Sequence, residues 1–334
     1  MTQVLQLVTR RHVFHVSDRL LSQRAGRTTV AFDSNCNKAI VFCATDAHVV
    51  VAYTGRAYLD HIPTDTFIAQ SLVGSVLSEG GAFIGVAGPP VWTDIGRSVE
   101  RLRHDLTEAF GRLPDADRTM NFQVSVMGWR QRRTRNKRIT PVVWHLNREE
   151  GAHDRPFVIE RGDRWWGWDR GYTLSGIPDV PTSIWTWLRD ELRTHGDKSP
   201  DEIKRILVDA LLRCADSRPE EINYSCTQIL LTPTVSPHAR VSFIADIRLP
   251  DGIQPLSPGY SPWVVAPPMA YAPALMRGGP EGGGWTNMST GYTWRYEGSI
   301  IPPEPAKPSD QSVRREPKAS HSSQARKRDP QKRR

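Results

Sequence analysis

The sequence lacks any run of about 18 or more apolar residues, so no segment is typical of a transmembrane helix. Its beginning also lacks the apolar core of a signal peptide, because Gln6 interrupts the stretch Val4–Val8 and Arg10–Arg11 follow it. We therefore expect a cytoplasmic protein that has no membrane partner.

Cysteine is scarce, and its four positions are scattered at 36, 43, 214 and 226. They form no CxxC pair and no Cys/His spacing of the kind that holds zinc, and the ten histidines form no HExxH motif. This pattern predicts reduced thiols in a cytosolic protein rather than a disulfide framework. It predicts no metal site and no cofactor.

Positive charge is concentrated at one end of the chain. Residues 301–334 contain ten Lys/Arg and four Asp/Glu, which gives +6 of the total net charge of +8. With few apolar residues to bury, this segment is predicted to be a disordered basic tail. Residues 249–300 form a Pro/Gly/Trp-rich extension, and residues 1–248 are long enough to form one substantial core.

The hydrophobic pattern alternates between strands and helices. Short β-rich runs are predicted at 4–8, 13–16, 29–32, 39–43 and 49–53, as one N-terminal layer. Helices are predicted over 64–77, with a stop at Gly80–Gly81, and over 95–113, with Thr93 as N-cap. Strands follow near 122–126, 142–144 and 157–159, with an arginine-rich hairpin tip at 130–138. The last elements are helices over 183–195 and 199–214, the second with a Ser199/Glu202 capping box, and strands over 226–231 and 241–247.

This order is strands, two helices, strands, two helices, strands. If the strand sets pack on each other and each helix pair covers an outer face, the fold is an α+β four-layer αββα sandwich.

One residue at the start of the chain has distinctive chemistry. Removal of Met1 would leave Thr2 with both a hydroxyl nucleophile and a free α-amine, and such an amine can act as the base for its own hydroxyl. Its ordinary pKa of about 7.7–8.0 suits proton transfer near neutral pH.

The layer order and several short motifs together resemble the N-terminal-nucleophile (Ntn) hydrolases, and most closely the proteasome β-subunit and its bacterial peptidase relatives. The resemblance covers about residues 2–247. Thr2 matches the family's nucleophile, and Asp18 in HVSDR follows it at the family spacing of sixteen positions. Lys38 in NKAIVF matches the lysine that opens a strand, and Gly55 in AYTGRA matches the glycine of the oxyanion hole.

The resemblance implies a threonine-type hydrolase that acts on peptide or amide bonds and needs no cofactor. Ser175 in TLSG and Ser225 in NYSC match the serines near the terminal amine, whereas Ile222 stands where the family usually has an aspartate. Because relatives assemble into rings, the resemblance also implies a homo-oligomer.

Two alternatives remain open at this stage. The Ile222 departure favours a catalytically inactive proteasome-like scaffold that serves as an interaction module. The basic tail and the arginine-rich run at 130–138 favour a nucleic-acid-associated protein that makes polyanion contacts through positive charge.

Overall fold

The computed structural model describes residues 3–9, 11–25, 28–33, 36–77, 86–87, 93–118, 121–131, 139–148, 155–161, 172–177, 180–193, 198–232, 238–244, 263–266, 269–271, 284–287 and 292–297. All of these residues belong to the unit Met1–Pro302. The predicted disordered tail, residues 132–138 of the hairpin tip predicted at 130–138, and Thr2 lie outside the described residues.

Two mostly antiparallel sheets of seven strands each form the centre of this unit. In order across the first sheet, the strands are β14 (Tyr172–Ile177), β1 (Val4–Thr9), β2 (Val13–Asp18), β15 (Cys226–Thr232), β16 (His238–Ile244), β20 (Tyr292–Glu297) and β19 (Gly284–Asn287). Across the second sheet they are β13 (Val158–Arg161), β12 (Ile139–Asn147), β11 (Gln123–Gln131), β6 (Ala47–Thr54), β5 (Ala39–Cys43), β17 (Trp263–Ala266) and β18 (Met269–Tyr271).

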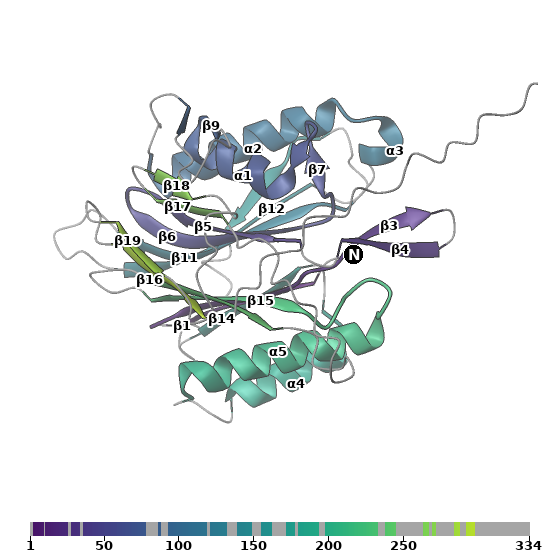
Figure 1. Cartoon of the computed structure of the whole chain (residues 1–334), viewed down its shortest axis with the longest axis vertical. Coiled ribbons are helices and arrows are strands. Elements are labelled where there is room, and N and C mark those ends of the chain that lie inside the picture. Colours follow the sequence, from purple (N-terminus) through teal and green to yellow (C-terminus); the bar gives the residue numbers. More distant parts are fainter. Residues whose placement is uncertain are drawn as a thin grey trace, which may run out of the picture. The chain divides into compact units, whose positions relative to one another are not determined.

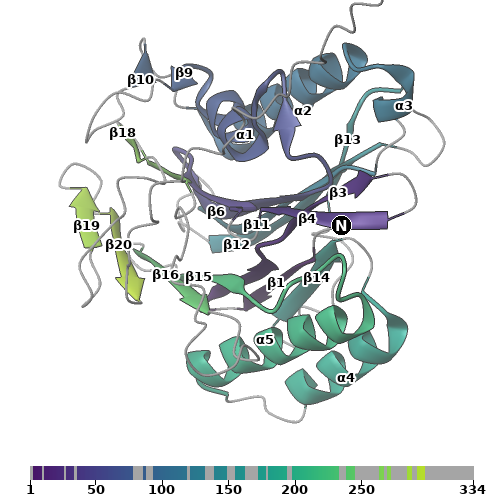
Figure 2. The same ribbon diagram turned by 45° about the vertical axis from the view of Figure 1, so that its right-hand side comes forward.

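A separate pair of helices packs against each sheet (Figures 1 and 2). Helices α1 (Thr64–Val73) and α2 (Ile95–Gly111) share one apolar cluster with the second sheet. Helices α4 (Thr182–Arg193) and α5 (Pro200–Ser217) share another with the first sheet. The sheets contact each other through β1, β2 and β15 on one side and β6 and β11 on the other. The described part of the chain is therefore a mixed α/β structure with two separate hydrophobic clusters, each between one sheet and its pair of helices.

Local sequence signals explain where the helices begin and end. The predicted capping box of α5 is confirmed, because the Ser199 side chain accepts from the Glu202 N–H and the Glu202 side chain accepts from Ser199. The predicted N-cap of α2 is wrong by one residue, since the side chain of Asp94, not Thr93, accepts from the Arg97 N–H. Helix α1 ends earlier than predicted because Gly74 adopts φ 71°.

The prediction that the first five strands form one layer is wrong. β1 and β2 belong to the first sheet, whereas β5 and β6 belong to the second. The other described strands form two-stranded antiparallel sheets: β3 (Leu21–Ala25) with β4 (Thr28–Asp33), β7 (Tyr58–Leu59) with β8 (Ile62–Pro63), and β9 (Val76–Leu77) with β10 (Val86–Ala87). Helix α3 (Asp115–Arg118) is a single turn after α2.

Sequence patterns missed the strands of the extension and β14. The extension adds β17 and β18 beside β5 and adds β20 and β19 beside β16. Both junctions, β5 with β17 and β16 with β20, are parallel. The Pro/Gly-rich extension thus supplies two strands to each sheet.

Candidate active site

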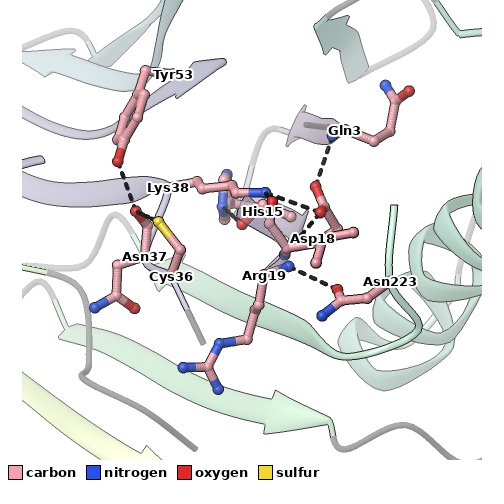
Figure 3. A network of polar contacts seen from close by, with 11 residues as sticks. Gln3, His15, Asp18, Arg19, Cys36, Asn37, Lys38, Tyr53 and Asn223 are labelled. Carbon is pink, nitrogen blue, oxygen red and sulfur yellow. Dashed lines mark hydrogen bonds and ion pairs between the residues drawn. The ribbon is translucent and has the colours of Figure 1, made fainter. Parts of the chain in front are cut away.

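Asp18 and Lys38 form a fully buried ion pair between the two sheets. Asp18 is the last residue of β2, and Lys38 immediately precedes β5. The Lys38 ammonium lies 2.9 Å from Asp18 Oδ2, and both side chains are 0% exposed. The ammonium also donates to the Leu20 carbonyl. Two residues that are far apart in the sequence are thereby joined in one polar centre (Figure 3).

The Asp18 carboxylate also binds the start of the first described strand. Gln3 N–H donates to Asp18 Oδ1 at 2.7 Å, and Asp18 N–H donates to the Gln3 carbonyl at 3.2 Å. Leu20 N–H donates to Asp18 Oδ2 at 3.0 Å. Burial raises the pKa of the Asp18 carboxyl, while Lys38 and the two N–H donors oppose that shift. Each carboxylate oxygen therefore has at least one donor.

The turn between α5 and β15 contacts two residues next to Asp18: Gln3, which binds its carboxylate, and Arg19, which follows it in the sequence. The Arg218 guanidinium donates to Gln3 Oε1 at 2.7 Å, and Asn223 Oδ1 accepts from the Arg19 N–H at 3.0 Å. Sequence reasoning missed both Arg218 and Asn223. Their contacts span 215 and 204 positions, and no local motif signals a pairing over such a distance.

Gly55 occupies a position that only glycine fits comfortably. Its φ is +111°, and a Cβ built on it would lie 2.4 Å from the Asn121 carbonyl oxygen. Gly55 follows β6, and the N–H of Tyr53, two positions earlier, donates to the Lys38 carbonyl at 3.1 Å. Gly55 therefore lies at the end of the second sheet where Lys38 also lies.

The second predicted serine, Ser225, lies close to the ion pair along the first sheet. It is 9% exposed and directly precedes Cys226, which pairs with Asp18 across β15 and β2. Ile222, three positions before it, is 1% exposed and belongs to the apolar cluster beneath α4 and α5. The Ile222 side chain thus anchors the turn in a hydrophobic core.

Ser175 belongs to a different group of contacts. It lies in β14 opposite Gln6 of β1, and its hydroxyl is 3.4 Å from His145 Nε2 of the second sheet. Burial lowers the pKa of His145, and the nearby Glu160 carboxylate opposes that shift. Among the described contacts, Ser175 is not joined to the Asp18–Lys38 pair.

Several neutral polar side chains lie buried near the contact between the sheets. His15 Nε2 is 3.0 Å from Ser17 Oγ, and burial lowers the pKa of His15 to about 3. Gln6 donates to the Val50 carbonyl at 3.4 Å. Among the residues that the structure describes, the buried atoms without a hydrogen-bond partner include Gln6 Oε1, His15 Nδ1, Ser125 Oγ and Thr227 Oγ1.

A smaller set of contacts flanks Lys38 on its other side. The Tyr53 hydroxyl donates to the Asn37 carbonyl at 2.9 Å, and the Cys36 thiol lies beside the same carbonyl at 3.2 Å (Figure 3). Burial raises the pKa of Tyr53 well above its ordinary value, and Cys36 acts in the same direction. The tyrosine is therefore a neutral donor at neutral pH.

Within the described ranges, no group of three or more His, Cys, Asp or Glu side chains is placed to hold a metal ion. All four cysteines are reduced thiols, of which Cys36 is partly exposed and the other three are buried. No described helix is both long and apolar enough to cross a membrane.

Solved structures that resemble this chain include the following two. One is Anbu (ancestral beta-subunit) from Yersinia bercovieri, with 11% identity and a TM-score of 0.38 over 69% of this chain and 81% of that chain. The other is BPH from Thiobacillus denitrificans in complex with Epoxomicin, with 11% identity and a TM-score of 0.39 over 70% of this chain and 99% of that chain.

No protein-family model and no curated protein matches the sequence. The resemblance to proteasome-like proteins that the sequence predicted is thus found among solved structures.

Proposed function

We propose that the chain is an N-terminal threonine amide hydrolase, a peptidase or amidohydrolase whose nucleophile is Thr2 after removal of Met1. One observation carries the proposal: the Asp18 carboxylate binds both Lys38 and the N–H of Gln3. Gln3 directly follows Thr2, and a trans peptide separates adjacent α-carbons by about 3.8 Å. Thr2 is therefore tethered one residue away from a buried charged centre.

The buried pair itself favours a functional site over a purely structural one. Removing two charges from water costs several kcal/mol per ion, and the attraction between them often only offsets that cost. Buried charges with shifted pKa values are therefore concentrated at functional sites. In this chain the pair lies at the start of β5 and the end of β2, directly beside the strand that begins the chain.

The proposed reaction uses the terminal amine as the base. The Thr2 hydroxyl oxygen attacks the amide carbonyl while the neutral α-amine accepts the hydroxyl proton. That proton then passes to the leaving amine, the C–N bond breaks, and an ester to Thr2 remains. Water, deprotonated by the same amine, hydrolyses the ester and restores the hydroxyl. The Lys38 ammonium favours the deprotonated hydroxyl and the neutral amine, and Asp18 holds that ammonium in place.

Gly55 is proposed to donate its N–H to the oxyanion that develops during attack. Its +111° φ and its position at the Lys38 end of the second sheet support this role. One such donor contributes about 3–4 kcal/mol in comparable sites. Ser225 and Ser175 are proposed to act near the terminal amine. The support is more direct for Ser225, because it precedes Cys226, which pairs with Asp18, whereas Ser175 pairs with Gln6.

The proposal includes an αββα order of four layers, with residues 249–300 as an extension and residues 301–334 as a disordered tail. The two apolar clusters, each shared by one sheet and one helix pair, support the layer order. The contacts of β1, β2 and β15 with β6 support the stacking of the two sheets.

A second candidate is an inactive proteasome-like scaffold. Ile222 favours it, because this side chain is 1% exposed within an apolar cluster and can neither accept nor donate a hydrogen bond. An amine network that depends on a carboxylate at that position is therefore absent.

The test is labelling by a peptide electrophile that reacts with hydroxyl nucleophiles, followed by mass analysis of the N-terminal peptide. We expect one probe per chain on a peptide that begins at Thr2, and no such label on Thr2→Ala. Thr186→Ala is the matched control, since Thr186 is exposed on α4 and its hydroxyl donates to the Thr182 carbonyl of the same helix at 2.9 Å. Equal labelling of Thr2→Ala and wild type, or Met1 retained in protein from its native cell, would refute the enzyme and favour the scaffold.

A further inference from the structure

The turn that follows α5 is held rigidly by its own backbone. Arg218 N–H donates to the Cys214 and Ala215 carbonyls at 3.1 and 3.2 Å. The Arg218 carbonyl accepts from the N–H groups of Glu221 and Ile222 at 3.0 and 3.1 Å. The buried Ile222 side chain then fixes the turn to the core beneath α4 and α5. The turn can therefore serve as a fixed support for whatever its polar side chains contact.

Two polar side chains of this turn, Arg218 and Asn223, contact residues that lie next to the Asp18–Lys38 pair. Arg218 donates to Gln3 Oε1 at 2.7 Å, and Gln3 is 0% exposed. Asn223 accepts from the N–H of Arg19, the residue after Asp18, at 3.0 Å. Gln3 is thus held twice, through its backbone by Asp18 and through its side chain by Arg218.

The location of Arg218 suits a fixed cation. It is the C-cap of α5, where the exposed carbonyl end of the helix dipole favours positive charge. A guanidinium presents its N–H donors in a fixed planar arrangement, which suits a bond of fixed geometry to Gln3 Oε1. A charged donor to a buried amide oxygen is also stronger than a neutral one.

We infer that Arg218, with Asn223, is a positioning residue that holds the N-terminal strand in register with the Asp18–Lys38 pair. This inference rests on the proposed function. It also gives the Ile222 position a physical explanation, because the apolar side chain anchors the turn while its flanking residues supply the polar contacts. Arg218 acts through Gln3 and is not itself in contact with the reacting atoms.

The experiment compares Arg218→Met, Arg218→Lys and Gln3→Met with wild type. Arg213→Met is the matched control, because Arg213 is exposed on the same helix and its guanidinium lies 4.1 Å from the Trp187 ring. Labelling at Thr2 is measured against probe concentration, which separates the maximal rate from the half-saturating concentration. Hydrogen exchange of residues 3–9 is measured on the same proteins.

Displacement of a reacting group by about 1 Å can cost about 100-fold in rate, so a smaller displacement should cost less. We expect Arg218→Met to lower the maximal labelling rate about tenfold, with the half-saturating concentration unchanged. Hydrogen exchange of residues 3–9 should become faster. Arg218→Lys should recover part of the rate, Arg213→Met should behave as wild type, and adding Gln3→Met to Arg218→Met should cause little further loss.

Wild-type labelling rates and exchange in Arg218→Met would overturn the inference. So would an equal loss in Arg213→Met, because that result would indicate a general effect of removing an arginine from α5. If wild type is not labelled at Thr2, the proposed function fails, whereas the exchange comparison alone still decides whether Arg218 holds the N-terminal strand.

Discussion

The protein buries two groups of polar side chains, and they are satisfied to different degrees. Around Asp18 and Lys38, the carboxylate and the ammonium are both bonded to more than one partner. Near the contact between the sheets, Gln6, His15, Ser125 and Thr227 each keep a buried atom with no partner among the described residues. A buried charge without partners costs far more than a neutral group in the same state, which explains why the Asp18 carboxylate and the Lys38 ammonium both have partners.

The largest effect is expected from breaking the charged group. Lys38→Met leaves the Asp18 carboxylate buried without its cation, and we expect the free energy of unfolding at pH 7 to fall by about 3–5 kcal/mol. Urea denaturation measures this change. The double variant Asp18→Asn/Lys38→Met removes both charges and should lose less than Lys38→Met alone. A loss below about 1 kcal/mol for Lys38→Met would show that the charge is not sealed from water.

The second-largest effect is a loss of folding stability at acid pH, caused by the buried neutral His15. An unfolded chain binds a proton at His15 near its ordinary pKa of 6.5, whereas folded His15 stays neutral until about pH 3. The unfolded state therefore binds more protons in this window, and stability is lost as pH falls from about 6.5 toward 3.

Between pH 7 and pH 5, His15 should account for a loss of about 2 kcal/mol. Burial also lowers the pKa of His48 to about 4, so that residue adds a similar loss. Urea denaturation at both pH values should show a smaller loss for His15→Leu than for wild type. An equal loss in the two proteins would mean that His15 is protonated in the folded state.

A substitution of Ser175 can show whether this residue acts with the Asp18–Lys38 pair or with the neutral side chains between the sheets. Its hydroxyl lies 3.4 Å from His145, so Ser175→Ala should lower the free energy of unfolding by about 1 kcal/mol, the usual net contribution of one hydrogen bond. If Ser175 belongs to the neutral group, labelling at Thr2 should stay within about twofold of wild type. A large loss of labelling in a stably folded variant would instead join Ser175 to the charged group.

The smallest effect is expected at Thr227, which is 1% exposed and whose hydroxyl has no described partner. Valine has nearly the same shape without the hydroxyl, so Thr227→Val should leave stability unchanged or raise it by up to about 1 kcal/mol. The urea midpoint measures this change, with Thr9→Val as a control that removes a bonded hydroxyl. A clear loss in Thr227→Val would reveal a partner such as an internal water molecule.

Short-range signals in the sequence predicted the features that depend on a few neighbouring residues. The Ser199/Glu202 capping box is one, because both of its bonds lie within three positions. Asp18 and Lys38 were each identified through the family resemblance, and the structure places Lys38 Nζ 2.9 Å from Asp18 Oδ2. Where two candidates compete locally, as at Thr93 and Asp94, the pattern was off by one residue.

Long-range pairings were not predictable from these patterns. Arg218 and Gln3 are an ordinary arginine and glutamine until the fold brings them together. The binding of Ser175 to His145 depends on how the edge of one sheet meets the other. The strands of the extension were missed because a Pro/Gly-rich composition is typical of loops and because their partners lie far back in the sequence.

The extension has a consequence for how the protein is made. Trp263 pairs with Ile40 and Thr293 pairs with His238, so strands from late in the described part of the chain cover the outer sides of β5 and β16. Until those residues have left the ribosome, the growing chain carries two uncovered strand edges, which are common starting points for aggregation. Expression fragments that end near residue 248 would keep both edges open permanently, so we expect them to aggregate more readily than fragments that end after Pro302.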